Sequence, residues 1–328
     1  MKHSLIITFG ILLTALSMHS ANASEQEHAH NHQKNERATA PQNQTSAESG
    51  NPLVVNAYDY AFDIPTEVKS GWAQVIVNNQ RAEEIHEVTI VRLPDEIDYQ
   101  TYLSEFIEPW MEIWQGMKDG DITRANLFST ASTMLPEWQS ELDYRHARGI
   151  VSPGKNAEAY AYLPPGTYAV ECWLKNEDGG VHIAHGMIRE LTVTASESRL
   201  QPPQQGTHLQ VSSNGIHMPD AITTGEQTFI VEVEPTEAGT PVHADLHLIR
   251  YDENVNPSNI VRWLDWYNVD GLTHPAPATF LGGYSTYGSA LIDNKAYFTV
   301  TINEPGDYAW VIQSDPESPV WMPFTVDE

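Results

Sequence analysis

Four side chains of this sequence could together hold a copper ion. Cys172 is the only cysteine, His182 and Met187 follow it within 15 residues, and His86 lies far upstream at the start of an alternating apolar run. A thiolate, two imidazoles and a thioether form the ligand set of a mononuclear copper site that transfers single electrons, and the sulfur donors favour Cu(I). The residue types therefore predict one bound copper ion.

Cys172 has a second interpretation that the residues alone leave open. A lone cysteine cannot form an internal disulfide, so in an oxidising compartment it needs another role, and metal ligation is one. The alternative is a buried cysteine that packs as a small hydrophobic side chain.

Residues 1–23 have the pattern of an export signal. A short polar start precedes an apolar core over residues 5–16 and an A-x-A cleavage site that ends at Ala23. The core is shorter than the roughly 20 apolar residues of a membrane-spanning helix, and no other stretch is long and apolar enough. We expect cleavage after Ala23 and a periplasmic or secreted protein with no membrane span.

Residues 24–50 are predicted to be a disordered tether, because they contain almost no large apolar side chains. Three alternating histidines, His28, His30 and His32, lie in this segment. They would either capture a transition metal weakly or be incidental to a solvated linker, and both interpretations stay open.

The chain is strongly acidic, with a formal net charge of -27 from 44 acidic and 17 basic residues. This charge argues against nucleic acid and anionic membrane surfaces as partners. We favour solubility as its role, and a second interpretation is steering toward an unidentified, basic redox partner protein.

The sequence contains a weak internal repeat. The pentapeptide PGTYA at 165–169 matches PGDYA at 305–309. Three further pairs match in the same order: 71–77 with 225–231, 87–93 with 245–251, and 157–163 with 297–303. Such self-similarity predicts a duplicated domain, with a first half at residues 51–196, a second half at 207–328 and a linker between them.

Both halves consist mainly of short alternating runs, such as residues 75–77 and 229–233, between turn residues. This pattern is typical of β-sandwiches. Residues 99–118 and, more briefly, 260–267 instead carry apolar side chains at helical spacing. We predict helical insertions there, at equivalent places in the two halves, whose aromatic side chains cover the core.

Residues 52–194 resemble the cupredoxin, or plastocyanin-like, family. The resemblance rests on the strand at 57–62, on Ile85-His86-Glu87-Val88, on the P-G-x-Y turn before Cys172, and on His182 to Met187. It implies a Greek-key β-sandwich that binds copper at one end, through His86, Cys172, His182 and Met187. The predicted fold class is therefore all-β, with two tandem Greek-key cupredoxin-like β-sandwiches and short helical insertions.

The loop from Cys172 to His182 departs from the family pattern. It has nine intervening residues, which is longer than usual, and Glu87 follows the first histidine where asparagine is common. Residues 176–180 are predicted to form a turn that would return the loop to the site. His185 is a competing ligand three residues after His182, and the choice between them stays open.

The second half is predicted to bind no copper. Ile312 stands where Cys172 aligns, His243 is offset by one position from the equivalent of His86, and only Met322 lies near a ligand position. We interpret the remaining histidines of this half, His208, His217, His247 and His274, as ordinary polar residues.

The predicted function is one-electron transfer by an exported copper-binding protein that is not an enzyme. A multicopper enzyme is rejected because Cys172 is flanked by Glu171 and Trp173, where such enzymes place histidines, and no His-x-His pair occurs outside the tether. Hydrolytic motifs are also missing from the sequence. The alternative is a non-redox binding or assembly module, or a periplasmic copper store.

Overall fold

The computed structural model describes residues 51–147, 149–212, 215–218, 221–235, 245–285, 291–313 and 320–327. They belong to one compact unit, Glu48–Glu328. The predicted export signal and tether, with His28, His30 and His32, lie outside the described residues, and so does His243. Among the described residues, no helix has the length and apolar character to cross a membrane.

The structure is mostly β, which confirms the predicted fold class. The strands of the first half are β1 (Pro52–Tyr58), β2 (Ala61–Asp63), β3 (Glu67–Asn79), β4 (Thr89–Arg92), β5 (Asp143–Ala147), β6 (Lys155–Leu163), β7 (Gly166–Glu171) and β8 (Ile188–Glu197). Those of the second half are β9 (Thr207–Ser212), β10 (Gly215–His217), β11 (Gly225–Val233), β12 (Asp245–Arg250), β13 (Thr279–Ser285), β14 (Lys295–Ile302), β15 (Gly306–Gln313) and β16 (Val320–Val326).

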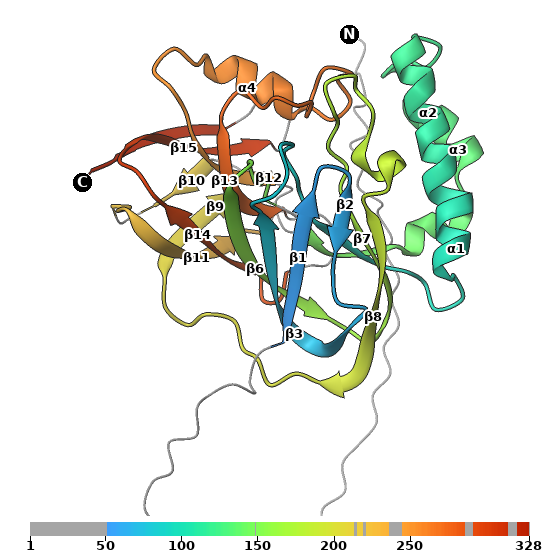
Figure 1. Ribbon diagram of the computed structural model, residues 1–328, viewed down its shortest axis with the longest axis horizontal. Coiled ribbons are helices and arrows are strands. Elements are labelled where there is room, and N and C mark those ends of the chain that lie inside the picture. Colours follow the sequence, from blue (N-terminus) through green and yellow to red (C-terminus); the bar gives the residue numbers. More distant parts are fainter. Residues whose placement is uncertain are drawn as a thin grey trace, which may run out of the picture. The chain divides into compact units, whose positions relative to one another are not determined.

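In the first half, one long strand links two layers of strands (Figure 1). The start of β3 pairs in parallel with β8, which continues through β7 and β4 to β5. The rest of β3 pairs with β1 and β6 instead. Alternate small apolar side chains of β6, such as Ala159 and Ala161, face the core between the layers, as the period of two in a strand requires.

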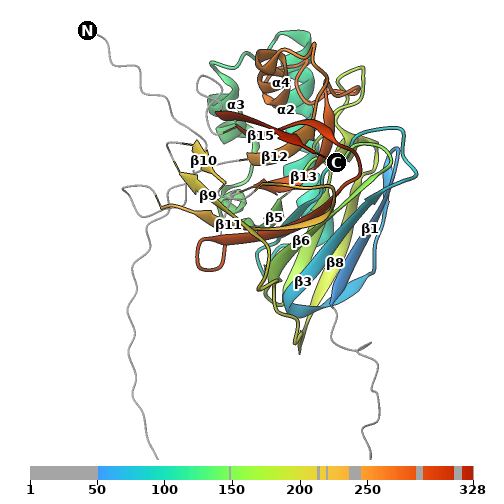
Figure 2. The same ribbon diagram turned by 90° about the vertical axis from the view of Figure 1, so that its left-hand side faces the viewer.

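In the second half, β10, β9, β11 and β14 form one layer, and β13, β12, β15 and β16 form a separate four-stranded sheet (Figure 2). The repeat seen in the sequence is also structural. Gly166 and Gly306 both have positive φ angles, of 151° and 141°, which glycine adopts without strain. Two residues later, Tyr168 and Tyr308 each donate a hydrogen bond to the carbonyl oxygen four residues upstream, at 2.6 and 2.7 Å.

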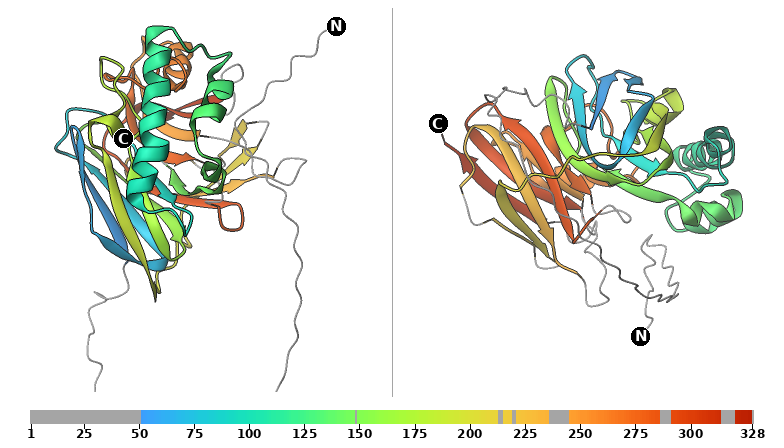
Figure 3. Two further views of the ribbon diagram at one scale, coloured as in Figure 1. Left: turned by 90° about the vertical axis from the view of Figure 1, so that its right-hand side faces the viewer. Right: turned by 90° about the horizontal axis from the view of Figure 1, so that it is seen from below.

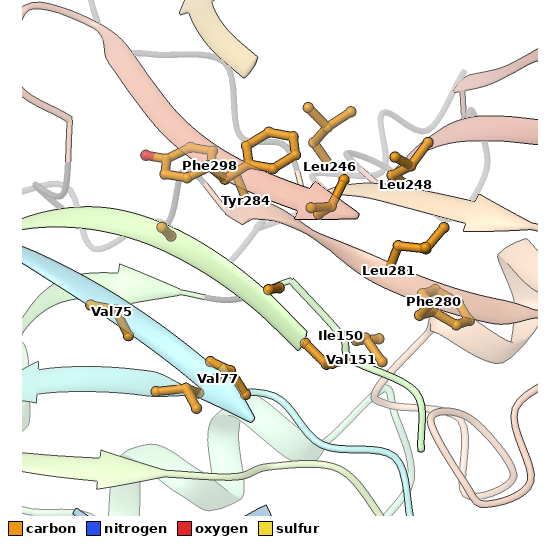
Figure 4. Close-up of a cluster of buried hydrophobic side chains, with 14 of the residues drawn as sticks. Val75, Val77, Ile150, Val151, Leu246, Leu248, Phe280, Leu281, Tyr284 and Phe298 are labelled. Atoms are coloured by element: carbon orange, nitrogen blue, oxygen red, sulfur yellow. The ribbon is translucent and has the colours of Figure 1, made fainter. Parts of the chain in front are cut away.

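The two halves, which the sequence predicted to be tandem sandwiches with a linker between them, are also joined by strand pairing. Strand β14 pairs antiparallel with β6, with Phe298 opposite Ala159, so that one sheet runs through both halves (Figure 3). One buried hydrophobic cluster also extends over both halves. In Figure 4, Val75 and Val77 of β3 lie on one side of this cluster, and Leu281 and Tyr284 of β13 lie on the other.

The helical insertions lie where the hydrophobic period predicted them, after β4 and after β12. The first comprises α1 (Tyr99–Tyr102), a π-helical turn η1 (Leu103–Ile107) and α2 (Glu108–Asp119), and the second is α4 (Pro257–Leu264). Two further helices were not predicted, α3 (Leu127–Met134) and the 3-10 helix η2 (Glu137–Glu141), and a short 3-10 turn, η3 (His182–His185), lies in the loop after Cys172.

The ends of these helices have chemical causes. Asp98 caps α1 by accepting a hydrogen bond from the amide of Thr101, and Asn256 caps α4 in the same way through Ser258. Helix α2 ends at Gly120, whose φ of 80° allows its amide to bond back to Met117.

Candidate metal centre

His86, Cys172 and His182 come together at the ends of three segments. His86 precedes β4 and exchanges two backbone hydrogen bonds with Val151, of 3.1 and 2.8 Å. Cys172 follows β7 directly, and its amide donates to the carbonyl of Met187 at 3.1 Å. His182 begins η3, with its amide on the carbonyl of Leu174 at 2.8 Å.

The donor atoms of these three side chains all lie within 4.8 Å of one another, and no other such group of His, Cys, Asp and Glu occurs among the described residues. The Cys172 Sγ lies 3.8 Å from the His86 Nδ1 and 3.4 Å from the His182 Nδ1. The two imidazole rings have centroids 5.2 Å apart at an angle of 62°. Both rings thus turn the same nitrogen toward the sulfur.

Met187 is fully buried and lies between the His182 turn and β8. Its amide donates to the carbonyl of His182 at 3.1 Å, while its carbonyl accepts from Cys172. The backbone of Met187 therefore connects the two ends of the loop that carries Cys172 and His182. Its thioether remains a proposed ligand.

The long loop after Cys172 folds back in the way that the sequence predicted. Asn176 and Gly180 face each other across a tight turn, in which the Asn176 amide donates to the Gly180 carbonyl at 2.9 Å. The Asn176 side-chain oxygen accepts in return from the Gly180 amide at 2.7 Å. The turn brings His182 to the cluster, whereas His185 is exposed on the surface and outside it.

Two buried carboxylates, those of Glu171 and Glu87, form hydrogen bonds where β7 ends and just before β4 begins, next to the cluster. Glu171, beside the thiol in sequence, accepts hydrogen bonds from the Tyr102 hydroxyl at 2.6 Å and from the Trp173 indole at 2.7 Å. Glu87 accepts from the Trp173 amide at 3.1 Å. Glu87 stands where asparagine is common in the cupredoxin family, and its hydrogen bond connects the segment before β4 to Trp173.

Sequence reasoning missed two residues beside the cluster, Glu84 and His274. The Glu84 Oε2 lies 3.8 Å from the His182 Nε2 and 3.5 Å from the His274 Nδ1. The Tyr60 hydroxyl donates to the other carboxylate oxygen of Glu84 at 3.1 Å. Burial raises the pKa of Glu84, and His274 opposes that shift. The position of Glu84 two residues before His86 was a signal for it, but none in the sequence pointed to His274.

The second half contacts the loop between Cys172 and His182, residues 173–181, through Lys175 of that loop. We call these residues the copper loop, after the predicted copper site. The Lys175 side chain is fully buried, and its ammonium group donates to the carbonyls of Trp266 and Asn268 at 2.7 and 2.9 Å. It also lies 4.0 Å from the ring centre of Trp114, in a cation–π contact. Burial lowers the Lys175 pKa to about 7, although Asp265 and Asp270 oppose this shift.

These residues fit a transition metal with nitrogen and sulfur ligands. Bond lengths of about 2.0 to 2.3 Å separate two ligand atoms of one ion by about 3.5 to 4 Å, and the two N–S distances here are 3.4 and 3.8 Å. Burial, with a smaller contribution from nearby histidines, lowers the pKa of His86 to about 3 and that of His182 to about 4. Both rings are therefore neutral at pH 7, as ligation requires.

The low pKa values of the two rings predict how stability depends on pH. An unfolded histidine has a pKa near 6.5, so below that pH the unfolded chain binds more protons than the folded one, and the free energy of unfolding falls as the pH falls toward 4. Between pH 6.5 and 5 this loss is about 2 kcal/mol for each ring.

Urea unfolding of the metal-free protein at pH 7 and pH 5 measures this loss. A His182→Asn variant should lose about 2 kcal/mol less than the parent over that interval, whereas His185→Ala should behave like the parent because its ring is exposed. Equal losses in the parent and His182→Asn would contradict the assignment of a neutral, buried ring.

No family model and no curated protein matches the chain. Among solved structures, the reduced auracyanin of Roseiflexus castenholzii is 18% identical, with a TM-score of 0.26 over 44% of this chain and 98% of that one. Auracyanin A of Chloroflexus aurantiacus, a "blue" copper protein, is 18% identical, with a TM-score of 0.25 over the same shares. A blue copper oxidase from Nitrosomonas europaea is 12% identical, with a TM-score of 0.20 over 84% of this chain and 85% of that one.

The strand-rich fold and the cluster of His86, Cys172 and His182 confirm the resemblance to the cupredoxin family that the sequence indicated. In the second half, the register of β12 and β15 places Ile312 at the position of Cys172, as expected. Met322 lies in β16 opposite Trp310.

Proposed function

We propose that this chain is an exported one-electron carrier that holds one copper ion in its first half through His86, Cys172, His182 and Met187. The observation that supports this most strongly is the convergence of two neutral imidazole nitrogens on one buried thiol. Copper, when bound, supplies the redox couple, and the protein supplies a soft, dry ligand set.

The site residues favour a carrier over an enzyme. Cys172 has Glu171 and Trp173 as neighbours, and both are engaged in structural hydrogen bonds. A second histidine-rich centre next to the thiolate is therefore not supported by the described residues. Export is proposed from residues 1–23 alone, and a basic redox partner from the acidic charge alone.

Copper storage is the second candidate. The side chains of His86, Cys172, His182 and Met187 are all fully buried, which favours slow release of a bound ion. Stoichiometric cycling with a mild reductant and oxidant separates the two functions. A carrier exchanges electrons rapidly through repeated cycles, whereas a store keeps its copper but reacts slowly.

The two neighbouring histidines provide a matched test of the ligand set. His182→Ala removes a buried nitrogen 3.4 Å from the thiol and should cost most of the copper affinity. His185→Ala removes an exposed ring from the same turn and should leave affinity near that of the parent. Competition with a copper chelator measures both, and a larger loss in His185→Ala would show that the loop was assigned wrongly.

A further inference from the structure

A second group of polar side chains, Glu84, His182 and His274, lies beside the proposed ligand cluster and contains several buried polar atoms. The Glu84 Oε2, the His182 Nε2 and the His274 Nδ1 are all buried atoms with no hydrogen-bond partner among the described residues. Glu84 Oε2 nevertheless lies between the two ring nitrogens, at 3.8 and 3.5 Å. Unsatisfied buried polar atoms are costly, so three that face one another call for a common role.

We propose that Glu84 is a positioning residue of the copper centre, which orients His182 through the Nε2 edge of its ring, and that His274 of the second half holds Glu84 in place. This inference rests on the proposed function. It also gives the second half, which lacks copper ligands of its own among the described residues, a part in tuning the site.

The chemistry of a ligating histidine supports this role. When one ring nitrogen binds a metal, the other carries the proton, and it is commonly oriented by a carboxylate that accepts this proton in a hydrogen bond. Because the His182 Nδ1 faces the thiol, the Nε2 becomes the donor, and the carboxylate of Glu84 is the acceptor that it faces.

Glu84 is itself fixed from several sides. The backbone carbonyl of Glu84 accepts a hydrogen bond from the side-chain amide of the buried Asn79 at 2.9 Å, and the Glu84 Oε1 accepts one from the Tyr60 hydroxyl. His274 is anchored to the copper loop, because its amide donates to the Lys175 carbonyl at 3.0 Å. The second half thus delivers an imidazole to Glu84 with the same segment that covers the loop after Cys172.

A fixed carboxylate near His182 should favour the more highly charged oxidation state of bound copper, because opposite charges attract strongly where water is excluded. Replacing Glu84 with glutamine keeps the shape and removes the charge. We expect Cu(II) affinity to fall by about ten- to hundredfold and Cu(I) affinity to fall less. Each tenfold difference raises the reduction potential by about 59 mV.

The experiment compares the copper-loaded full chain with Glu84→Gln, His274→Gln and the double variant, by redox titration and by chelator competition. Glu83→Gln, an exposed neighbour, is the matched control and should keep the parent potential. His274→Gln should raise the potential by a smaller amount, because Glu84 then keeps its contacts with Tyr60 and Asn79 and loses only the contact with His274. In the double variant, His274→Gln should not raise the reduction potential beyond that of Glu84→Gln alone, since His274 acts through Glu84.

An unchanged potential and Cu(II) affinity in Glu84→Gln would overturn the inference while leaving the proposed function intact, provided that the parent binds copper. If the parent protein binds no copper, both this inference and the proposed function are contradicted. Should Glu84→Gln fail to fold, as thermal unfolding without metal would show, His274→Gln decides: a raised potential supports the inference, and a parent-like one overturns it.

Discussion

Replacing Cys172 with serine should abolish the visible absorption of the copper-loaded protein. A thiolate bound to Cu(II) gives strong charge-transfer bands, which imidazole and hydroxyl ligands cannot give. Serine also replaces a soft donor with a hard one, so Cu(I) binding should weaken. An absorption spectrum with one equivalent of Cu(II) and a competition assay for Cu(I) measure the two effects.

The matched control for this substitution is Met187→Leu, which removes the other sulfur and keeps the thiolate. This variant should retain copper and its visible band but shift the reduction potential, because an axial thioether mainly tunes the site. Thermal unfolding without metal checks that Cys172→Ser still folds, since its side chain is fully buried. A strong visible band that survives in Cys172→Ser would show that the thiol is not a ligand.

Replacing Trp266 with alanine should lower the free energy of unfolding by about 3 kcal/mol, at the lower end for a buried tryptophan because its ring is only half-buried. Trp266 connects the second half to the copper loop. Its indole donates to the Trp173 carbonyl at 2.8 Å, and its ring packs on Trp114 with centroids 4.8 Å apart. Its own carbonyl accepts from the ammonium of Lys175.

Chemical unfolding measures this loss, with two variants for comparison. Trp266→Phe keeps an aromatic ring but not the indole donor and should lose about 1 kcal/mol. Tyr162→Ala, at a residue that is 38% exposed, should cost at most about 1 kcal/mol through its contact with Trp72. A loss in Trp266→Ala no larger than in Tyr162→Ala would refute the role of Trp266 as a link between the halves.

Much of the site could be predicted because its information is local. Cys172, His182 and Met187 lie in one short segment, and the turn at residues 176–180 that returns His182 was indicated by Asn and Gly. The helix within residues 99–118 followed from its apolar period. The helix α3 was missed because Leu127–Met134 is rich in serine and threonine, which favour caps and turns.

The features that sequence could not reveal depend on contacts between distant segments. His274 approaches Glu84 only because the second half packs against the copper loop. The pairing of β6 with β14 is likewise set by packing, since a strand edge does not specify its neighbour. Lys175 carries a charge that favours the surface, and two carbonyls together with the indoles of Trp114 and Trp266 make its burial favourable.

The most direct test of the proposed function is a titration of the purified, metal-free protein with Cu(II), followed by absorption spectroscopy. The arrangement of His86, Cys172 and His182 predicts a strong visible band that saturates at one equivalent, disappears with a mild reductant and returns on reoxidation. Zinc at the same concentration should give no such band. A protein that takes up no copper at one equivalent, or binds it without visible charge-transfer absorption, would contradict the proposed copper–thiolate centre.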